Sequence, residues 1–417
     1  MLKNKIILCY NGIEKTVKIP KNYSELEDIF LKEFKEDRNK KFSFSDMEKI
    51  DKNNDNDFSK IIEEIKKKSK PIISISLINE NINNELKLSQ NYEIINLTED
   101  SYAHSESCLD RLDNTFITFK SIDGIYYIIY ANINKSIISY DLIDNKKINE
   151  IKKAHNNYIT NFRYYFDEFN KRDLMISISN KDSNVKIWNI NNWSCINDIK
   201  NVYNSNILLS ACFLNDINEI FIATSSYSES IIKVFALNGT KKTINFIHNN
   251  IFMIDNFYDK KLNKNFLIIG CEGIVESFDY NNNCGYKIYS NKDVAAHYNL
   301  IINYKEEVIQ IIESNSDGLI KIWDFHSAKL LMKINIDSIR LYGFCLWNKK
   351  YLFVGCLDET IRLIDIENGK IIQSLYGQES IPLTIKKINH PKYGESLISQ
   401  GNLNDQIKLW INLSDHN

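Results

Sequence analysis

The chain has 417 residues, enough for about two or three domains, and its 43% hydrophobic and 12% aromatic content disfavours a disordered chain. Its 52 basic and 54 acidic residues leave a net charge of −2, so the overall charge does not predict binding to nucleic acid or to an anionic membrane. The eight cysteines include no Cys-x-x-Cys pair, which argues against a zinc site or a disulfide framework and favours a reducing compartment.

The N-terminus offers only residues 6–10 as an apolar stretch, which is too short for the core of a signal peptide. No apolar run approaches the roughly 18 residues that a membrane span needs. We therefore expect a cytoplasmic protein without stable membrane insertion; a ciliary or nuclear compartment continuous with the cytosol is the alternative location.

Residues 1–80 predict a small mixed domain. Residues 5–10 and 13–19 alternate as two strands joined by an Asn-Gly hairpin turn. Ser24 fits a helix N-cap with Glu27 three residues later, and the apolar residues that follow share one helical face. A strand at 41–45, an acidic loop, a second helix and a last strand complete the predicted order.

This order resembles the ubiquitin-like β-grasp fold, and in particular the Phox/Bem-type interaction domain. The resemblance covers about 80 residues and implies a charge-based contact with a second protein or another copy of the chain. The implied interaction residues are basic ones near the first strand and acidic ones after the third: Lys3, Lys5, Asp46, Glu48 and Asp51. Ordinary surface charge is the alternative.

Two further charged segments of this region have alternative interpretations. Residues 51–58 have the oxygen-bearing pattern of a calcium loop, but Ile62 stands where the closing glutamate is expected, so a solvated loop is favoured. The lysines at 66–68 and 70 end the predicted second helix, where the helix dipole favours cations. They could instead bind RNA or an anionic lipid.

From residue 92 onward the chain repeats itself. Residues 317–324, Asp-Gly-Leu-Ile-Lys-Ile-Trp-Asp, have close copies at 182–189, 358–365 and 404–411. An aromatic residue or isoleucine near the end of each copy stands at positions 140, 188, 235, 278, 323, 364 and 410. A period of about 45 residues with short strands in each unit predicts a seven-bladed β-propeller.

The repeats resemble WD-repeat propellers, which implies an all-β fold and a buried network of aspartate, histidine, hydroxyl and tryptophan in complete blades. We expect these residues to stabilise blades rather than to catalyse a reaction. The expected network members are His155, Ser179, Asp182, Trp188, His297, Ser314, Asp317, Trp323, Asp358 and Trp410.

The predicted domains are therefore a β-grasp domain at 1–80, a polar linker at 81–90 and a seven-bladed propeller at 91–417. The last repeat lacks an outer strand, and residues 92–98 are expected to supply it. Pairing the two ends of the propeller in this way would remove its exposed sheet edges.

The sequence lacks the phosphate-binding, metalloprotease and serine-hydrolase motifs, so we expect a non-enzymatic interaction scaffold without a cofactor or metal. The partners would be other proteins, and nucleic acid is not favoured. An anionic-ligand module for RNA or phosphoinositide is the alternative, and a propeller hydrolase is less favoured. The WD-repeat resemblance places the partner-binding propeller face at Thr160, Lys181, Ser316, Arg340, Leu357 and Leu403.

Overall fold

The computed structural model divides into two compact units, Met1–Lys87 and Leu88–Asn417, and each is described by itself. The described residues are 5–10, 13–34, 41–44, 59–60, 62–63, 65, 72–78, 92–98, 100–103, 114–179, 181–204, 208–216, 219–226, 229–237, 241–245, 250–289, 297–305, 308–336, 340–402 and 406–412.

Among its described residues, the first unit contains a four-stranded sheet of order β2-β1-β4-β3 and helix α1. The strands are β1 (Lys5–Tyr10), β2 (Ile13–Lys18), β3 (Lys41–Phe44) and β4 (Ile72–Ile78). The central strands β1 and β4 are parallel, whereas β2 and β3 pair antiparallel with them at the edges.

Helix α1 (Tyr23–Phe34) buries one face against this sheet. Tyr23, Leu26 and Phe30 are buried at helical spacing, which is the pattern of an amphipathic helix. The core they join contains residues from β1, β2 and β4 and two isoleucines from the segment before β4: Ile6, Leu8, Val17, Ile73, Ile62 and Ile65.

The helix begins earlier than the sequence predicts. Asn22 is the N-cap, because its side-chain oxygen accepts the backbone N–H of Glu25 at 2.9 Å. Glu25 in turn accepts the N–H of Lys21 at 2.6 Å, a reciprocal arrangement close to a capping box. Ser24, the expected cap, therefore lies in the first helical turn because Asn22 occupies the capping position.

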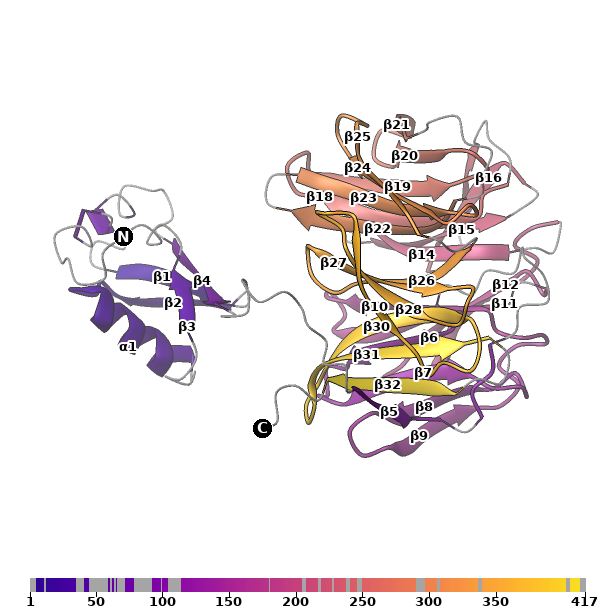
Figure 1. Ribbon diagram of the computed structural model, residues 1–417, viewed down its shortest axis with the longest axis horizontal. Coiled ribbons are helices and arrows are strands. Elements are labelled where there is room, and N and C mark those ends of the chain that lie inside the picture. Colours follow the sequence, from indigo (N-terminus) through magenta and orange to yellow (C-terminus); the bar gives the residue numbers. More distant parts are fainter. Residues whose placement is uncertain are drawn as a thin grey trace. The chain divides into compact units, whose positions relative to one another are not determined.

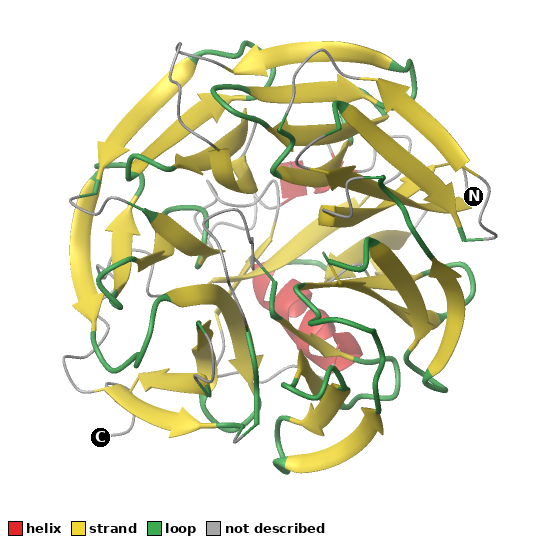
Figure 2. Ribbon diagram, turned by 90° about the vertical axis from the view of Figure 1, so that its right-hand side faces the viewer, coloured by secondary structure: helices red, strands yellow, loops and turns green. Residues whose placement is uncertain are grey.

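The second unit is a seven-bladed β-propeller, mostly β as the sequence predicts, with seven four-stranded antiparallel sheets (Figure 1). Figure 2 shows the sheets arranged around a central axis. Each innermost strand contacts the innermost strand of the next blade, from β6 through β30 and back to β6. The strands of a blade, from the innermost outward, are called a, b, c and d.

The first four blades follow one another along the chain. Blade 1 contains β6 (Phe116–Lys120), β7 (Tyr126–Ala131), β8 (Ile137–Asp141) and β9 (Lys146–Ile151). Blade 2 contains β10 (Asn161–Asp167), β11 (Arg172–Ser179), β12 (Asn184–Asn189) and β13 (Ser194–Ile199). Blade 3 contains β14 (Leu208–Asp216), β15 (Glu219–Ser226), β16 (Ile231–Ala236) and β17 (Lys241–Asn245). Blade 4 contains β18 (Met253–Asp259), β19 (Lys264–Gly270), β20 (Val275–Asp279) and β21 (Cys284–Tyr289).

The last three blades include one strand from the start of the unit. Blade 5 contains β22 (His297–Lys305), β23 (Val308–Asn315), β24 (Leu319–Asp324) and β25 (Leu330–Asn335). Blade 6 contains β26 (Leu341–Leu346), β27 (Tyr351–Cys356), β28 (Ile361–Asp365) and β29 (Lys370–Leu375). Blade 7 contains β30 (Pro382–His390), β31 (Gly394–Gly401), β32 (Ile407–Asn412) and, as strand d, β5 (Tyr92–Asn96).

The ring is closed by β5, which pairs antiparallel with β32 so that Ile94 lies opposite Trp410. The hydroxyl of Thr98 accepts the N–H of Ile407 at 3.1 Å just beyond this pairing. Blades 7 and 1 are also joined near the axis, because the N–H of Thr115 donates to the hydroxyl of Thr384 at 3.0 Å. Both ends of the propeller sequence therefore stabilise the same blade.

Apolar side chains fill the spaces between neighbouring blades. Strand β11 is buried on both faces, since Ile176 and Ile178 pack toward blade 3 while Met175 packs toward blade 1. Burying one such side chain contributes about 1.5–3 kcal/mol, so these layers account for much of the stability of the ring. The antiparallel strands place the a–b and c–d turns on one face, the a–b face, and the b–c turns with the connections between blades on the other, the b–c face.

Candidate functional site

The complete polar network of blade 2 centres on Ser177. The indole N–H of Trp188 donates to the Ser177 hydroxyl at 2.8 Å, and His155 Nε2 lies 2.7 Å from the same oxygen. Because a tryptophan N–H can only donate, Ser177 accepts from Trp188. The hydroxyl oxygen has a second lone pair, so the tautomer of His155 decides whether its Nε2 accepts the Ser177 proton or donates to the same oxygen. Burial, with the nearby charge of Lys186, lowers the pKa of His155 to about 3, so this histidine is neutral at physiological pH.

Ser179, the hydroxyl expected from the sequence, does not belong to this network. Its hydroxyl is buried and makes no hydrogen bond with the residues that the structure describes. The strand register explains the difference, since Trp188 lies opposite Met175 and the next residue on the same face of β11 is Ser177. The hydroxyl partner therefore stands two residues earlier than predicted.

Asp182 stabilises the connection between blades rather than the histidine. Its carboxylate accepts the backbone N–H of Asn157 at 2.7 Å. Nδ1 of His155 is buried and has no hydrogen-bond partner within the described part of the chain. Half-buried Asp182 and buried His155 thus lie in the same region between blades, but they act on separate partners.

The same arrangement recurs in other blades with different loop residues. In blade 7, Trp410 donates to Ser399 at 2.7 Å, and Ser399 lies 2.7 Å from the side-chain oxygen of Gln378. In blade 3, the Tyr203 hydroxyl lies 3.2 Å from the hydroxyl of Thr224. The hydroxyl precedes the tryptophan by 11 residues in blades 2 and 7, the two blades in which a tryptophan donates to a serine. The loop residue stands 21 or 22 positions before the hydroxyl, a spacing signal that the sequence contains.

Blade 5 uses a carboxylate in place of the hydroxyl. The indole N–H of Trp323 donates to Glu313 at 2.8 Å, and Glu313 is fully buried. Ser314, the expected partner, accepts instead from the side-chain amide of Asn299 at 3.0 Å. The network of this blade is therefore displaced by one residue from the prediction.

The tight turn of blade 5 is held by Asn315 and not by Asp317. The side-chain oxygen of Asn315 accepts the backbone N–H groups of Asp317 and Leu319, both at 3.1 Å. His297 is the first residue of β22 and lies opposite Asn315, so it stands on the innermost strand rather than in the preceding loop. Its side chain is outside the described atoms.

Asp358 organises its own turn in blade 6, where the expected aromatic is Ile364. Its carboxylate accepts the Thr360 hydroxyl and the Arg362 guanidinium, both at 2.6 Å. Burial alone would raise the pKa of Asp358, but hydrogen bonds from Thr360 and Arg362 bring it below the ordinary value. Asp358 therefore stabilises a turn at the surface, and no histidine is among its described partners.

Strand c carries a cation two residues before the aromatic or isoleucine position in most blades. In blade 3, the Lys233 ammonium donates to the carbonyl of Val202 at 2.6 Å. In blade 7, the Lys408 ammonium donates to the carbonyl of Gly377 at 2.8 Å. These cations attach the connection between blades to the sheet. The residues at this strand position are Lys186, Lys233, Lys321, Arg362 and Lys408.

The residues expected on the partner-binding face differ in exposure. Thr160 is buried, and its backbone N–H donates to Ile178 at 2.8 Å, so its side chain does not lie on the surface. Lys181 and Leu357 are exposed at b–c turns. Ser316 and Arg340 are half-buried. Leu403 lies outside the described residues.

The charged residues expected in the N-terminal unit cannot be placed on a surface. Lys3, Asp46, Glu48 and Asp51 lie outside the described residues, as do the remaining positions of the acidic segment at 51–58. Lys5 begins β1, but only its backbone is described.

The a–b face, which the sequence did not single out, carries exposed apolar side chains at its turns. Phe169 is 78% exposed between β10 and β11, and Tyr304 is 48% exposed near the end of β22. Large exposed side chains in or beside a–b turns are Ile122, Phe169, Tyr258, Leu262, Tyr304 and Val308. The rings of Phe257 and Tyr304 lie 6.3 Å apart, so the turns of blades 4 and 5 are neighbours. Clusters of this kind commonly mark interaction surfaces.

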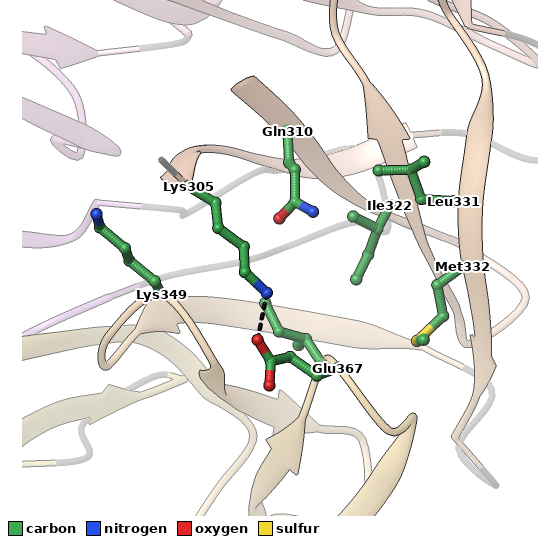
Figure 3. Close-up of a pocket in the computed structure, with 8 residues that line it drawn as sticks. Lys305, Gln310, Ile322, Leu331, Met332, Lys349 and Glu367 are labelled. Atoms are coloured by element: carbon green, nitrogen blue, oxygen red, sulfur yellow. Dashed lines mark hydrogen bonds and ion pairs between the residues drawn. The ribbon is translucent and has the colours of Figure 1, made fainter. Parts of the chain in front are cut away.

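A pocket of about 210 Å³ lies beside this surface, between blades 5 and 6 (Figure 3). Lys305 and Lys349 lie on one side of it, and Leu331 and Met332 lie on the other. Buried Ile322 and Ile366 also line it. The pocket thus combines an apolar wall with a cationic one.

The polar groups of the pocket are held in place by Asn303. Its side-chain amide donates to Gln310 at 3.0 Å and to the carbonyl of Lys349 at 3.1 Å. Lys305 forms an ion pair with Glu367, and both side chains are more than one-third exposed, so this pair contributes little to stability. The Lys349 side chain is exposed and forms no ion pair with a described residue.

Comparison with known proteins gives one distant similarity. No family model matches the chain. Over 147 residues the chain is 20% identical to the U3 small nucleolar RNA-associated protein 21 homolog of Schizosaccharomyces pombe. The match covers 35% of this chain and 16% of that protein, so the chain spans a minor part of the length of the relative it matches.

A polar cluster lies near the a–b face of the propeller. His326 Nε2 is 3.3 Å from the buried carboxylate of Asp259, and its Nδ1 is 3.3 Å from the Tyr286 hydroxyl. The Asp259 contact has ion-pair distance without hydrogen-bond geometry. Burial, followed by the charge of Asp259, raises the pKa of Tyr286 and also that of Tyr304. Both phenols therefore remain protonated at physiological pH and act as neutral surface groups.

The described residues contain no group of three or more His, Cys, Asp or Glu side chains placed to hold a metal ion. Within the same residues, none of the helices has both the length and the apolar character needed to cross a bilayer. The geometry that stands out on the propeller is therefore the apolar a–b face with the pocket between blades 5 and 6.

Proposed function

We propose that the chain is a non-enzymatic interaction scaffold whose propeller binds a protein partner through the a–b face. The observation that carries this proposal is the set of exposed apolar side chains at several a–b turns of one propeller face, among them Phe169, Tyr258 and Tyr304. A surface that exposes aromatic rings on a rigid ring has the composition of a protein interface core. Tyrosine is among the residues that contribute most to such interfaces.

The size and chemistry of the pocket also favour binding over catalysis. Its volume of about 210 Å³ is below the roughly 300–1,000 Å³ of typical sites for small molecules and cofactors. Its opposed charges, Lys305 and Glu367, pair with each other on the surface and do not form a desolvated acid–base pair.

We further assign the propeller to the WD-repeat class and the first unit to the β-grasp class. The network of Trp188, Ser177 and His155 supports the first assignment. The sheet order β2-β1-β4-β3, with parallel central strands and helix α1 packed on one face, supports the second. A charge-based protein contact of the first unit and a cytoplasmic location stay predictions.

The test compares crosslinked partners of three tagged full-length chains in the cells that make the protein. The a–b variant carries Phe169→Ser, Tyr258→Ser and Leu262→Ser, and the matched b–c variant carries Lys181→Glu and Leu357→Ser. We expect the a–b variant to lose partners that the b–c variant retains, with both unfolding at the temperature of the unchanged chain. If the a–b variant kept its crosslinked partners and the b–c variant lost them, the choice of the a–b face would be overturned.

An RNA-binding function is the alternative suggested by the name of the distant relative. It predicts that partner recovery falls steeply with salt and disappears after nuclease treatment. Protein partners that persist through nuclease and through 0.5 M salt (roughly three times physiological ionic strength) would support the scaffold proposal.

A further inference from the structure

We propose that the pocket between blades 5 and 6 binds one large aliphatic side chain of a partner peptide, with a neighbouring carboxylate of that peptide placed against Lys349. The inference rests on the proposed scaffold function and specifies what its a–b face recognises. The apolar side chain would contact Ile322, Leu331 and Met332, and the carboxylate would face the cationic side of the pocket (Figure 3).

The volume selects a side chain rather than a whole ligand. About 210 Å³ is too small for a typical cofactor but has room for the side chain of leucine, isoleucine or methionine. Leu331 is 43% exposed and would lose solvent contact when the pocket is filled. Burial of apolar surface from both partners is the main favourable contribution in such a contact.

The charges select an acidic neighbour. Lys349 is exposed, forms no ion pair with another described residue, and has its backbone carbonyl fixed by Asn303 at 3.1 Å. Lys305 is the second cation, but Glu367 neutralises it. The cationic side therefore offers one uncompensated positive charge, which favours a carboxylate and disfavours a lysine or arginine at that point of the peptide.

Glu367 gives the inference a distinctive consequence. Replacing it with glutamine releases Lys305 from its ion pair and gives the pocket a second uncompensated cation. The backbone N–H of Glu367, which donates to Asp365 at 2.9 Å, is not altered by that substitution. An acidic peptide should therefore bind the Glu367→Gln chain more tightly than the unchanged chain.

The experiment measures binding of fluorescein-labelled ten-residue peptides to the full chain by fluorescence anisotropy. Each peptide has one leucine in a Gly/Ser background and one aspartate one, two or three positions away. Control peptides replace leucine with alanine or aspartate with lysine. We expect the Leu/Asp peptides to bind, and both controls to bind at least about fivefold more weakly, as expected for loss of about 1 kcal/mol.

Four variants test the pocket. Lys349→Glu should weaken the Leu/Asp peptide about fivefold and favour the Leu/Lys peptide, whereas Glu367→Gln should strengthen the Leu/Asp peptide severalfold. Leu331→Asp should abolish binding of both the Leu/Asp and the Leu/Lys peptides. Lys260→Glu, a charge reversal at the a–b turn of blade 4, should change the affinity for either peptide little. Matching circular dichroism and unfolding temperature for all four would exclude misfolding.

Two results would overturn the inference. One is that the Leu/Asp peptides show no measurable binding at millimolar concentrations of the chain. The other is that they bind, but Leu331→Asp and Lys349→Glu do not change their affinity. Partner capture that depends on Phe169 and Tyr258 in either of those cases would leave the scaffold proposal intact and reject only the pocket. Equal binding of a single-stranded RNA ten-mer at 0.15 M salt, weakened by Lys349→Glu, would instead assign this surface to nucleic acid.

Discussion

Trp188 donates its indole N–H to Ser177, a residue on the neighbouring strand 11 positions earlier, at 2.8 Å. The same oxygen lies 2.7 Å from His155, so one hydroxyl joins strand b, strand c and the connection from blade 1. Because all three residues are buried, each polar group depends on this oxygen for its hydrogen bond. Truncating the small side chain of Ser177 should therefore lower the stability of blade 2 by more than its size alone would suggest.

Ser177→Ala should lower the free energy of unfolding by about 1–3 kcal/mol, because it leaves the Trp188 N–H and His155 Nε2 buried without a partner. Ser179→Ala is the matched control on the same strand, and it should change stability by less than about 0.5 kcal/mol since its hydroxyl has no described partner. Urea denaturation gives the free energy of unfolding of each variant and of the unchanged chain. Equal losses would show that the hydroxyl of Ser179 is used in solution.

His155→Gln should reduce the acid sensitivity of the propeller. The folded state lowers the pKa of His155 to about 3, whereas the unfolded chain titrates near 6.5. The stability associated with neutral His155 is thus complete above about pH 6.5 and is lost as pH falls toward 3. Between pH 7.5 and 5, the unchanged chain should lose about 2 kcal/mol more than the variant.

Glutamine is chosen because Gln378 occupies the corresponding place in blade 7 and reaches Ser399 at 2.7 Å. The variant should therefore fold and provide a hydrogen-bond partner for the Ser177 hydroxyl. Denaturation at several pH values gives the comparison. Parallel pH curves for the two chains would mean that His155 is protonated in the folded state or that another group determines acid unfolding.

The seven-bladed ring was predictable because the repeat period is a property of chain length per blade and survives substitution of individual residues. The detailed network was not, because it depends on strand register. Ser177 and Ser179 lie on the same face of β11, and the sequence alone does not say which of them lies nearest Trp188. In blade 5, Glu313 accepts from Trp323, a combination that the expected hydroxyl pattern does not include.

The contact residues predicted from the sequence and the surface proposed from the structure rest on different kinds of evidence. The WD-repeat resemblance placed contact residues at fixed repeat positions on the b–c face, and Thr160 among them is buried. The exposed apolar residues of the a–b face, such as Phe169 and Tyr304, lie in turns that differ from blade to blade. A repeat pattern cannot indicate them, since exposure of a turn residue depends on how the neighbouring blades pack.

Gly355→Ala should disrupt the contact between blades 6 and 7. A β-carbon at this position would lie 2.3 Å from the carbonyl oxygen of Pro382, so backbone must move to admit it. We expect a loss of about 1–3 kcal/mol, as in other overpacked cores. Gly285→Ala is the control, since its nearest atom is the flexible carboxylate of Glu276 at 3.1 Å. Thermal unfolding of both variants checks the difference, which should vanish if the blades can separate slightly.

Removing β5 should open the propeller, and two truncated chains isolate its contribution. The chain 88–417 keeps β5 and removes the first unit, whereas 97–417 also removes the strand that pairs with β32. The shorter chain loses the half-buried Ile94 and Ile95, which together contribute about 3–6 kcal/mol if fully buried and less here. It also exposes the backbone of β32, which forms the edge of blade 7 once β5 is absent.

We expect 88–417 to be a folded monomer and 97–417 to unfold at a lower temperature and to self-associate, as measured by calorimetry and light scattering. If both chains were equally stable and monomeric, pairing between β5 and β32 would not be what closes the ring.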